Sequence, residues 1–145
     1  MKMKDVFFEK GRENARILRA AAKEMSGTEI IDRERDAPQF EPDRDYSGFP
    51  VGSPVRDRGQ VWLLLQPHHA AHFDGRPETL RALWGVAHTT DPKKAKTWIA
   101  PLGTCGIYVK GECYRGAGGA IYRCRAESTV HSAEEYADAW ERVTA

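Results

Sequence analysis

The sequence lacks the signatures of several large classes of protein. Its 145 residues include three cysteines and no Cys-x-x-Cys pair, so neither a disulfide framework nor a zinc site is expected. The longest purely apolar run, 61–65, is far too short to span a membrane. No Gly-x-Ser-x-Gly elbow, His-Glu-x-x-His motif or phosphate-binding loop occurs. We therefore predict a protein that is not an enzyme, holds no cofactor or metal and does not insert into a membrane.

The charge of the chain is nearly balanced. The formal net charge is +1 and the isoelectric point is near 7.8, so no general attraction to nucleic acid is expected. Almost half of the charged side chains lie in residues 1–45, which indicates a solvated, helix-prone segment. The first residues contain no apolar signal-peptide core, and we expect no export signal in them.

Residues 4–25 have the composition of a helix, with Glu, Lys, Arg, Ala and Leu and no proline. Five positions recur at the spacing of a short seam along one helix face: Phe7, Asn14, Leu18, Ala21 and Met25. Gly11 also falls on this seam, where it adds no packing and costs about 1 kcal/mol relative to alanine. Burial of the seam in a homo-oligomer and docking of the helix on a partner are the two alternatives that this pattern leaves open.

Residues 26–50 predict a short helix followed by a linker. Ser26 and Glu29 have the spacing of a capping box, which begins a second helix. The stretch 36–50 contains three prolines and many acidic residues, which is typical of a linker or an extended arm. We assign residues 1–47 to one N-terminal segment that attaches the protein to a partner or to sister copies.

Beyond Gly48 the pattern changes to short strands. Val55 and Val61 flank a predicted hairpin in which Gly59 takes the left-handed turn position. Residues 77–84 begin like a helix, because proline stands in the first turn. Three of these residues would share the buried face of that helix: Leu80, Leu83 and Trp84.

A second hairpin is predicted around the glycine-rich loop 116–120. A two-residue turn at 118–119 would place Cys113 opposite Cys124. That pair would occupy a hydrogen-bonded position, where the spacing between strands is wider. Two free, neighbouring thiols are therefore favoured over a disulfide.

The strongest pattern in the chain is an internal repeat. In each copy an aromatic residue lies three positions before a glycine, a hairpin follows and ends in a second aromatic, and a tryptophan closes the unit. These positions are Phe49, Gly52, Trp62 and Trp84 in the first copy and Tyr108, Gly111, Tyr122 and Trp140 in the second. We therefore predict an α+β fold in which an N-terminal helix precedes two small, hairpin-based, three-stranded modules at 48–90 and 91–145. Neither module would be very stable alone, so the two are expected to pack together or onto another chain.

The second copy resembles the small chitin- and cellulose-binding modules, whose pattern is aromatic-x-x-Gly, a hairpin, an aromatic and a terminal tryptophan. The whole chain resembles phage and prophage tail-associated proteins that place such modules behind an N-terminal helical segment; residues 25–29, 91–96 and 110–113 carry this likeness. The resemblance implies a non-enzymatic virion protein, made in the host cytoplasm, with phage tail or fibre proteins as partners. A bacterial surface polysaccharide is the implied ligand. One departure is His131, which stands where these modules place an exposed aromatic ring.

Sugar binding by such modules requires exposed rings, because the apolar C–H face of a pyranose stacks on an aromatic ring. The candidate ligand-binding residues are Tyr108, Tyr122 and His131 in the second copy and, more weakly, Phe49 and Trp62 with His68 or His69 in the first. The alternative is that the rings form the core, and this is favoured for Trp84 and Trp140. The chain would then be a purely structural virion or assembly protein, or a tail-fibre assembly chaperone, without glycan affinity.

His68 and His72 have the spacing of metal ligands on a helix. Pro67 and Gly75 bracket the segment, however, and both favour a loop over a helix. We therefore predict a polar surface loop and no metal site.

Overall fold

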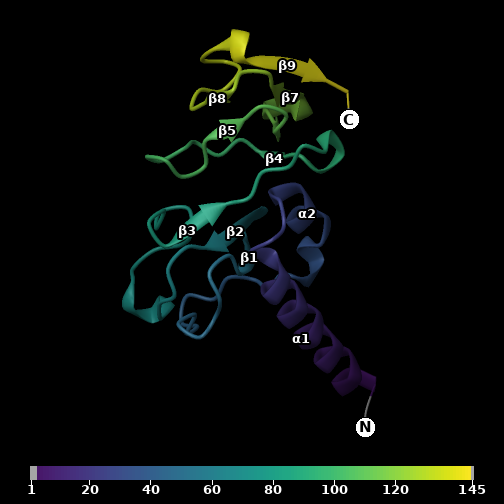
Figure 1. Cartoon of the computed structure of the whole chain (residues 1–145), viewed down its shortest axis with the longest axis vertical. Coiled ribbons are helices and arrows are strands. Elements are labelled where there is room, and N and C mark those ends of the chain that lie inside the picture. Colours follow the sequence, from purple (N-terminus) through teal and green to yellow (C-terminus); the bar gives the residue numbers. More distant parts are fainter. Residues whose placement is uncertain (1–2, 145) are drawn as a thin grey trace.

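The structure, a computed structural model, describes residues 3–144, and their side chains from residue 9 onward. It has one long helix at the N-terminus followed by small, mostly antiparallel sheets, which confirms the predicted α+β class (Figure 1). The helices are α1 (Met3–Ala22) and α2 (Gly27–Asp32). The strands are β1 (Pro54–Asp57), β2 (Gln60–Leu64), β3 (Trp84–Val86), β4 (Lys96–Thr97), β5 (Tyr108–Val109), β6 (Cys113–Arg115), β7 (Ile121–Cys124), β8 (Ser128–Thr129) and β9 (Trp140–Val143).

Helix α1 projects from one end of the molecule, and its C-terminal part packs on the body of the protein (Figure 1). Leu18 on the predicted seam is fully buried, and Met25 packs beside Ala22 in a core cluster that also includes Val61 of β2. The C-terminal end of the seam therefore packs against other residues of the same chain. The predicted position Phe7 lies outside the residues whose side chains are described.

Helix α2 begins with the predicted capping box. The Ser26 hydroxyl accepts a hydrogen bond from the Glu29 amide at 3.2 Å, and the Ser26 amide donates to the Glu29 carboxylate at 3.1 Å. Two orphan amides are satisfied in this way, which stabilises a helix of only six residues. Ile30 and Ile31 then anchor the helix in the same core cluster.

Replacement of Gly27 by alanine is expected to destabilise the protein strongly. Gly27 opens α2, and a Cβ atom there would lie 2.2 Å from the carbonyl oxygen of His88. Backbone cannot move aside as a flexible side chain can, so we expect a loss of about 1–3 kcal/mol or more in the free energy of unfolding, measured by urea denaturation. Gly11→Ala is the control: its Cβ atom meets nothing within 4 Å, and we expect a gain of about 1 kcal/mol there. Equal stability of Gly27→Ala and the wild-type protein would contradict this packing.

The first sheet has the strand order β1-β2-β3, and all its pairs are antiparallel. The predicted hairpin is confirmed: Asp57 pairs with Gln60 across a two-residue turn in which Arg58 and Gly59 have φ values of 51° and 78°. Such positive angles match the twist of the strands in tight hairpins, and glycine adopts them without strain.

The prediction of a helix at 77–84 is wrong. The segment forms turns, in which the amide of Leu80 donates to the carbonyl of Arg76. Trp84 then enters β3 opposite Leu64, so the sheet takes the backbone groups that a helix would have used. Leu80 and Leu83 still pack on the core beside the fully buried Trp84, as the sequence pattern predicted.

The interpretation of 36–50 as a linker is also wrong. Ala37, Phe40 and Tyr46 of this segment are buried in or beside the first core. The Phe40 amide donates to the Arg56 carbonyl at 2.8 Å, and the Arg56 amide donates to the Pro38 carbonyl at 2.8 Å. The segment thus runs along the outer edge of β1. Prolines are tolerated there because no further strand has to form hydrogen bonds with the outer side of the segment.

The second sheet has the order β4-β6-β7-β9, in which only the β4–β6 pair is parallel, and β5 and β8 form a separate pair. The predicted register of its hairpin is wrong by one position, since Cys113 pairs with Arg123 and not with Cys124. The loop 116–120 is closed by the Gly116 amide, which donates to the Ala120 carbonyl, so the turn is wider than two residues.

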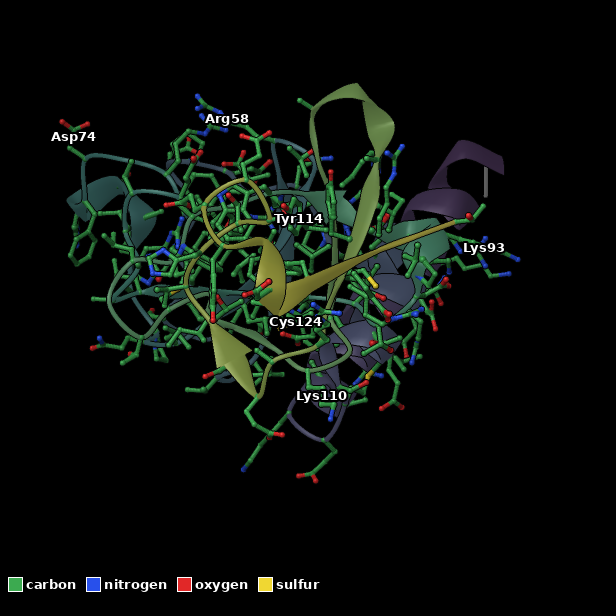
Figure 2. The ribbon with its side chains drawn as sticks, turned by 90° about the horizontal axis from the view of Figure 1, so that it is seen from above. Arg58, Asp74, Lys93, Lys110, Tyr114 and Cys124 are labelled. Carbon is green, nitrogen blue, oxygen red and sulfur yellow. The ribbon has the colours of Figure 1, made fainter. Side chains whose placement is uncertain are left out.

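All three cysteines are free, as the sequence favoured for Cys113 and Cys124. Both of these thiols are buried, and burial raises the pKa of each. Figure 2 shows Cys124 near the axis of the molecule, with Lys93 and Lys110 at its periphery. The two thiols are therefore held protonated in the core at neutral pH.

The same backbone contacts occur in both sheets. The Gly52 amide donates to the Leu64 carbonyl at 2.7 Å, and the Gly111 amide donates to the Cys124 carbonyl at 2.8 Å. The two glycines have nearly equal φ values, 95° and 94°. Both are in the left-handed region, which explains why glycine stands at each position.

The aromatic cores beside the two sheets also share contacts. The Tyr46 hydroxyl accepts a hydrogen bond from the backbone amide of Glu41, and the Tyr108 hydroxyl accepts one from the backbone amide of Ile99. Tyr46 lies edge-on to Trp84 at 5.2 Å, and Tyr108 lies edge-on to Trp140 at 5.4 Å. The contacts of Tyr108 in the second core are therefore matched in the first core by those of Tyr46, whereas the sequence pattern had pointed to Phe49.

Candidate functional site

Two of the predicted sugar-binding rings lie in the core. Trp62 and Tyr108 each expose only 1% of their surface. The Tyr108 ring is stacked between His88 at 3.7 Å and Trp98 at 4.9 Å, and burial raises the pKa of its hydroxyl. Neither face of this ring can accept a sugar, so the prediction of ligand contact is wrong for Tyr108 and for Trp62.

The other three candidates do not form a common surface. Tyr122 is half-buried and stacks on Tyr114 at 5.3 Å. Phe49 is half-buried in the other half of the chain, with the Arg19 guanidinium 4.4 Å above its ring. His131 is exposed, but it shares no exposed surface with Tyr108, because Tyr108 is in the core.

Two aromatic rings that the sequence analysis missed are the exposed ones. Among the aromatic side chains of residues 9–144, those with large exposure are Phe73, at 42%, and Tyr136, at 52%. Phe73 lies in the loop between β2 and β3, and Tyr136 lies in the loop between β8 and β9. Each loop precedes the strand that begins with the closing tryptophan, Trp84 or Trp140. The sequence contains one signal for these two rings, which is the presence of an aromatic residue in each of the two loops.

Phe73 lies beside an open hollow of about 600 Å³. Its ring is edge-on to His68 at 5.3 Å, which supports it from below the surface. Apolar side chains line much of the hollow, and Leu102 among them is 57% exposed. The Arg81 side chain in the same hollow is held in place, because it donates to the carbonyl oxygens of Glu78 at 2.7 Å and of Ala100 at 3.3 Å. The hollow thus combines an exposed ring, an apolar wall and a fixed cation.

Tyr136 is held on a short turn in the segment that leads into β9. Its amide donates to the Ser132 carbonyl at 2.8 Å, and the Ser132 amide donates to the Glu135 carboxylate at 3.2 Å. Hydrogen bonds from Ser132 lower the pKa of the Glu135 carboxyl, so it is ionised at neutral pH. His131 lies 3.6 Å from the same carboxylate. The segment that presents the exposed ring therefore also carries polar groups that can bind hydroxyls.

The histidine-rich segment forms bends and one short 3-10 turn rather than an α-helix. His68 is buried, with its Nδ1 atom 2.7 Å from the Gln66 carbonyl oxygen, whereas His72 is exposed. Within the described part of the chain, no group of three or more His, Cys, Asp or Glu side chains is placed to hold a metal ion. Over the same residues, no helix combines the length and the apolar character that a bilayer crossing needs.

Comparison with known proteins gives no family assignment. No protein-family model matches the chain, and no curated protein has a significantly similar sequence.

Proposed function

We propose that this chain is a non-enzymatic, phage tail-associated protein that contacts bacterial surface glycans through Phe73 and Tyr136. We further propose that it is built from two copies of one small β unit. The matching hydrogen bonds of Gly52 and Gly111 and the matching aromatic cores support the duplication. The N-terminal helix would then attach the protein to the particle or to sister copies.

The observation that carries the glycan proposal is the placement of the two exposed rings. Each of them lies in the loop that precedes a closing tryptophan, while the equivalent core rings are buried. An exposed ring offers a flat apolar face on which the apolar face of a pyranose can stack. The polar groups beside Tyr136 and the fixed Arg81 beside Phe73 would bind the sugar hydroxyls.

Two weak sites on one chain are enough for useful binding. When both bind one polysaccharide, the second contact is intramolecular, and the apparent affinity can exceed that of one site by about 10²–10⁴-fold. Several copies of the chain on one particle would raise it further. This is why a single modest stacking contact per unit suffices.

Tyr136→Ala is expected to lower the apparent affinity for the polysaccharide by about 10²-fold, because only the Phe73 site then remains. The measurement is a depletion isotherm of the purified chain on chitin, on cellulose and on bacterial cell walls. Val130→Ala is the matched control, since Val130 is 45% exposed in the same loop but carries no ring. Absence of saturable binding to all three surfaces by the wild-type chain would contradict the proposed function.

A second candidate is a purely structural virion or assembly protein. The burial of Trp62 and Tyr108, two of the rings predicted to bind sugar, favours it. Such a protein would be retained in purified phage particles and would bind none of the three polysaccharide surfaces. A tail-fibre assembly chaperone would instead be absent from purified particles, so mass spectrometry of the particles separates these two roles.

A further inference from the structure

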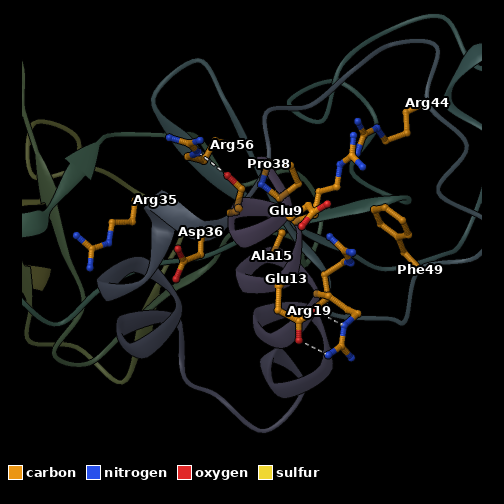
Figure 3. A pocket seen from close by; sticks show the side chains of 14 residues that line it. Glu9, Glu13, Ala15, Arg19, Arg35, Asp36, Pro38, Arg44, Phe49 and Arg56 are labelled. Carbon is orange, nitrogen blue, oxygen red and sulfur yellow. Dashed lines mark hydrogen bonds and ion pairs between the residues drawn. The ribbon is translucent and has the colours of Figure 1, made fainter. Parts of the chain in front are cut away.

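A strongly positive groove lies between α1 and residues 35–56 (Figure 3). Its volume of about 940 Å³ is at the upper end of the range of about 300–1,000 Å³ that is usual for ligand sites. Six arginines line it: Arg12, Arg16, Arg19, Arg35, Arg44 and Arg56. Three carboxylates accompany them: Glu9, Glu13 and Asp36.

The charge of this arginine groove differs from that of the rest of the chain. Six cations against three anions leave a formal charge of +3 on the lining. The whole chain carries +1, so all other residues together carry −2. The positive charge is thus gathered at one place, which creates a local attraction for anions that the net charge of the chain conceals.

Four of the six lining arginines make no ion pair with a described carboxylate: Arg12, Arg19, Arg35 and Arg56. Among the described residues, no carboxylate lies within 4.0 Å of the Arg19 or the Arg35 guanidinium. Arg19 is positioned over the Phe49 ring at 4.4 Å, a contact that orders the side chain without using its hydrogen-bond donors. The neighbouring Arg56 is fixed as well, because its Nε donates to the Ala37 carbonyl at 2.7 Å. The guanidinium groups of Arg19 and Arg56 are therefore held in place before any ligand arrives.

The arginines also repel one another. Partial burial, followed by the positive charges of Arg44 and Arg16, lowers the pKa of the Arg19 guanidinium. Glu13 compensates Arg16 and Glu41 compensates Arg44, but nothing in the described lining compensates Arg19. A bound anion would remove this repulsion and gain charge-assisted hydrogen bonds.

We propose that the arginine groove binds an acidic segment of a partner polypeptide. Arginine clusters recognise acidic motifs because the planar guanidinium matches a carboxylate through two parallel hydrogen bonds. The lining also contains Glu9, Glu13 and Asp36. A peptide can place neutral residues opposite these carboxylates, whereas a nucleic-acid backbone carries a phosphate at every nucleotide and fits less well. The groove shares no lining residue with the hollow beside Phe73, so this attachment is separate from glycan contact.

The test is fluorescence anisotropy of the full chain with a short labelled peptide of glutamate, aspartate and glycine. We expect saturable binding that weakens as salt is added, and no binding of the same peptide with glutamine and asparagine in place of the acids. The double variant Arg19→Glu/Arg35→Glu is expected to bind at least about tenfold more weakly, because two charge contacts become repulsive. Arg19→Gln/Arg35→Gln, which introduces no negative charge, checks the result if the first variant melts early.

The matched control is Lys110→Glu/Arg142→Glu, which makes the same change in net charge at two exposed positions of the second half of the chain. We expect it to bind the acidic peptide within about twofold of the wild-type affinity. Equal losses in the two double variants would show a general charge effect and overturn the proposal. Tight binding of a single-stranded oligonucleotide with none of the peptide, or no binding of either probe, would overturn it too. Neither outcome would affect polysaccharide binding by Phe73 and Tyr136.

Discussion

A chain in which both Phe73 and Tyr136 are replaced by alanine is expected to lose all measurable binding to a polysaccharide that the wild-type chain binds saturably. Each single variant keeps one stacking site and loses avidity, whereas the double variant keeps none. The loss relative to the wild-type chain should therefore exceed the avidity factor of about 10²–10⁴-fold. Depletion isotherms on the same insoluble polysaccharide measure all four proteins.

The folded state of the double variant should be unchanged, because both rings are largely exposed, at 42% and 52%. A double control, Val51→Ala/Val130→Ala, removes exposed apolar groups from the two halves of the chain without removing a ring. The conservative variant Phe73→Tyr/Tyr136→Phe keeps both rings and should keep binding. Wild-type affinity in the double alanine variant would show that the chain binds the polysaccharide through other residues.

Trp140→Ala is expected to have the largest effect on stability. The side chain is 4% exposed and lies edge-on to Tyr114 at 4.8 Å and to Tyr108 at 5.4 Å. Its indole N–H donates to the His131 carbonyl at 2.8 Å, and the substitution removes this hydrogen bond as well. A tryptophan-to-alanine change in a core costs about 3–5 kcal/mol, out of a total of about 5–15 kcal/mol for a typical domain.

Urea denaturation followed by near-ultraviolet circular dichroism measures this loss. Tyr136→Ala, in the loop that precedes Trp140, is the control. We expect it to change the free energy of unfolding by less than about 0.5 kcal/mol. If Trp140→Ala and the wild-type protein had the same midpoint of urea denaturation, the ring would not hold the second sheet together.

The locally determined parts of the fold could be predicted from the sequence. The capping box of Ser26 and Glu29 and the tight turn at Gly59 each depend on contacts between residues close in the chain. The burial of Trp84 and Trp140 followed from their position at the end of each repeat and their size.

The parts that were predicted wrongly depend on contacts between distant residues. Residues 36–50 have the composition of a linker, but Phe40 and Tyr46 complete the aromatic core around Trp84. The segment 77–84 has a helical pattern, but β2 pairs with its last residue and extends it into a strand. Composition and periodicity carry no information about a pairing partner, and tertiary contacts override the local preference.

The candidate site illustrates the same limit. The repeat is defined by its aromatic residues, but the pattern alone does not distinguish a core ring from a surface ring. Tyr108 and Tyr136 are both tyrosines of the second half, yet the first is sandwiched between His88 and Trp98 and the second is exposed. Exposure is decided by the packing of the whole chain, and a sequence pattern does not describe that packing.

The most direct test is nuclear magnetic resonance of the aromatic side chains during titration with a soluble oligosaccharide of the polysaccharide that the chain binds. We expect the ring signals of Phe73 and Tyr136 to shift in a saturable manner, while those of Tyr108 and Trp62 stay in place. Shifts at Tyr122 and His131 without any at Tyr136, or no shift at either exposed ring, would contradict the assignment of the sugar-binding surface.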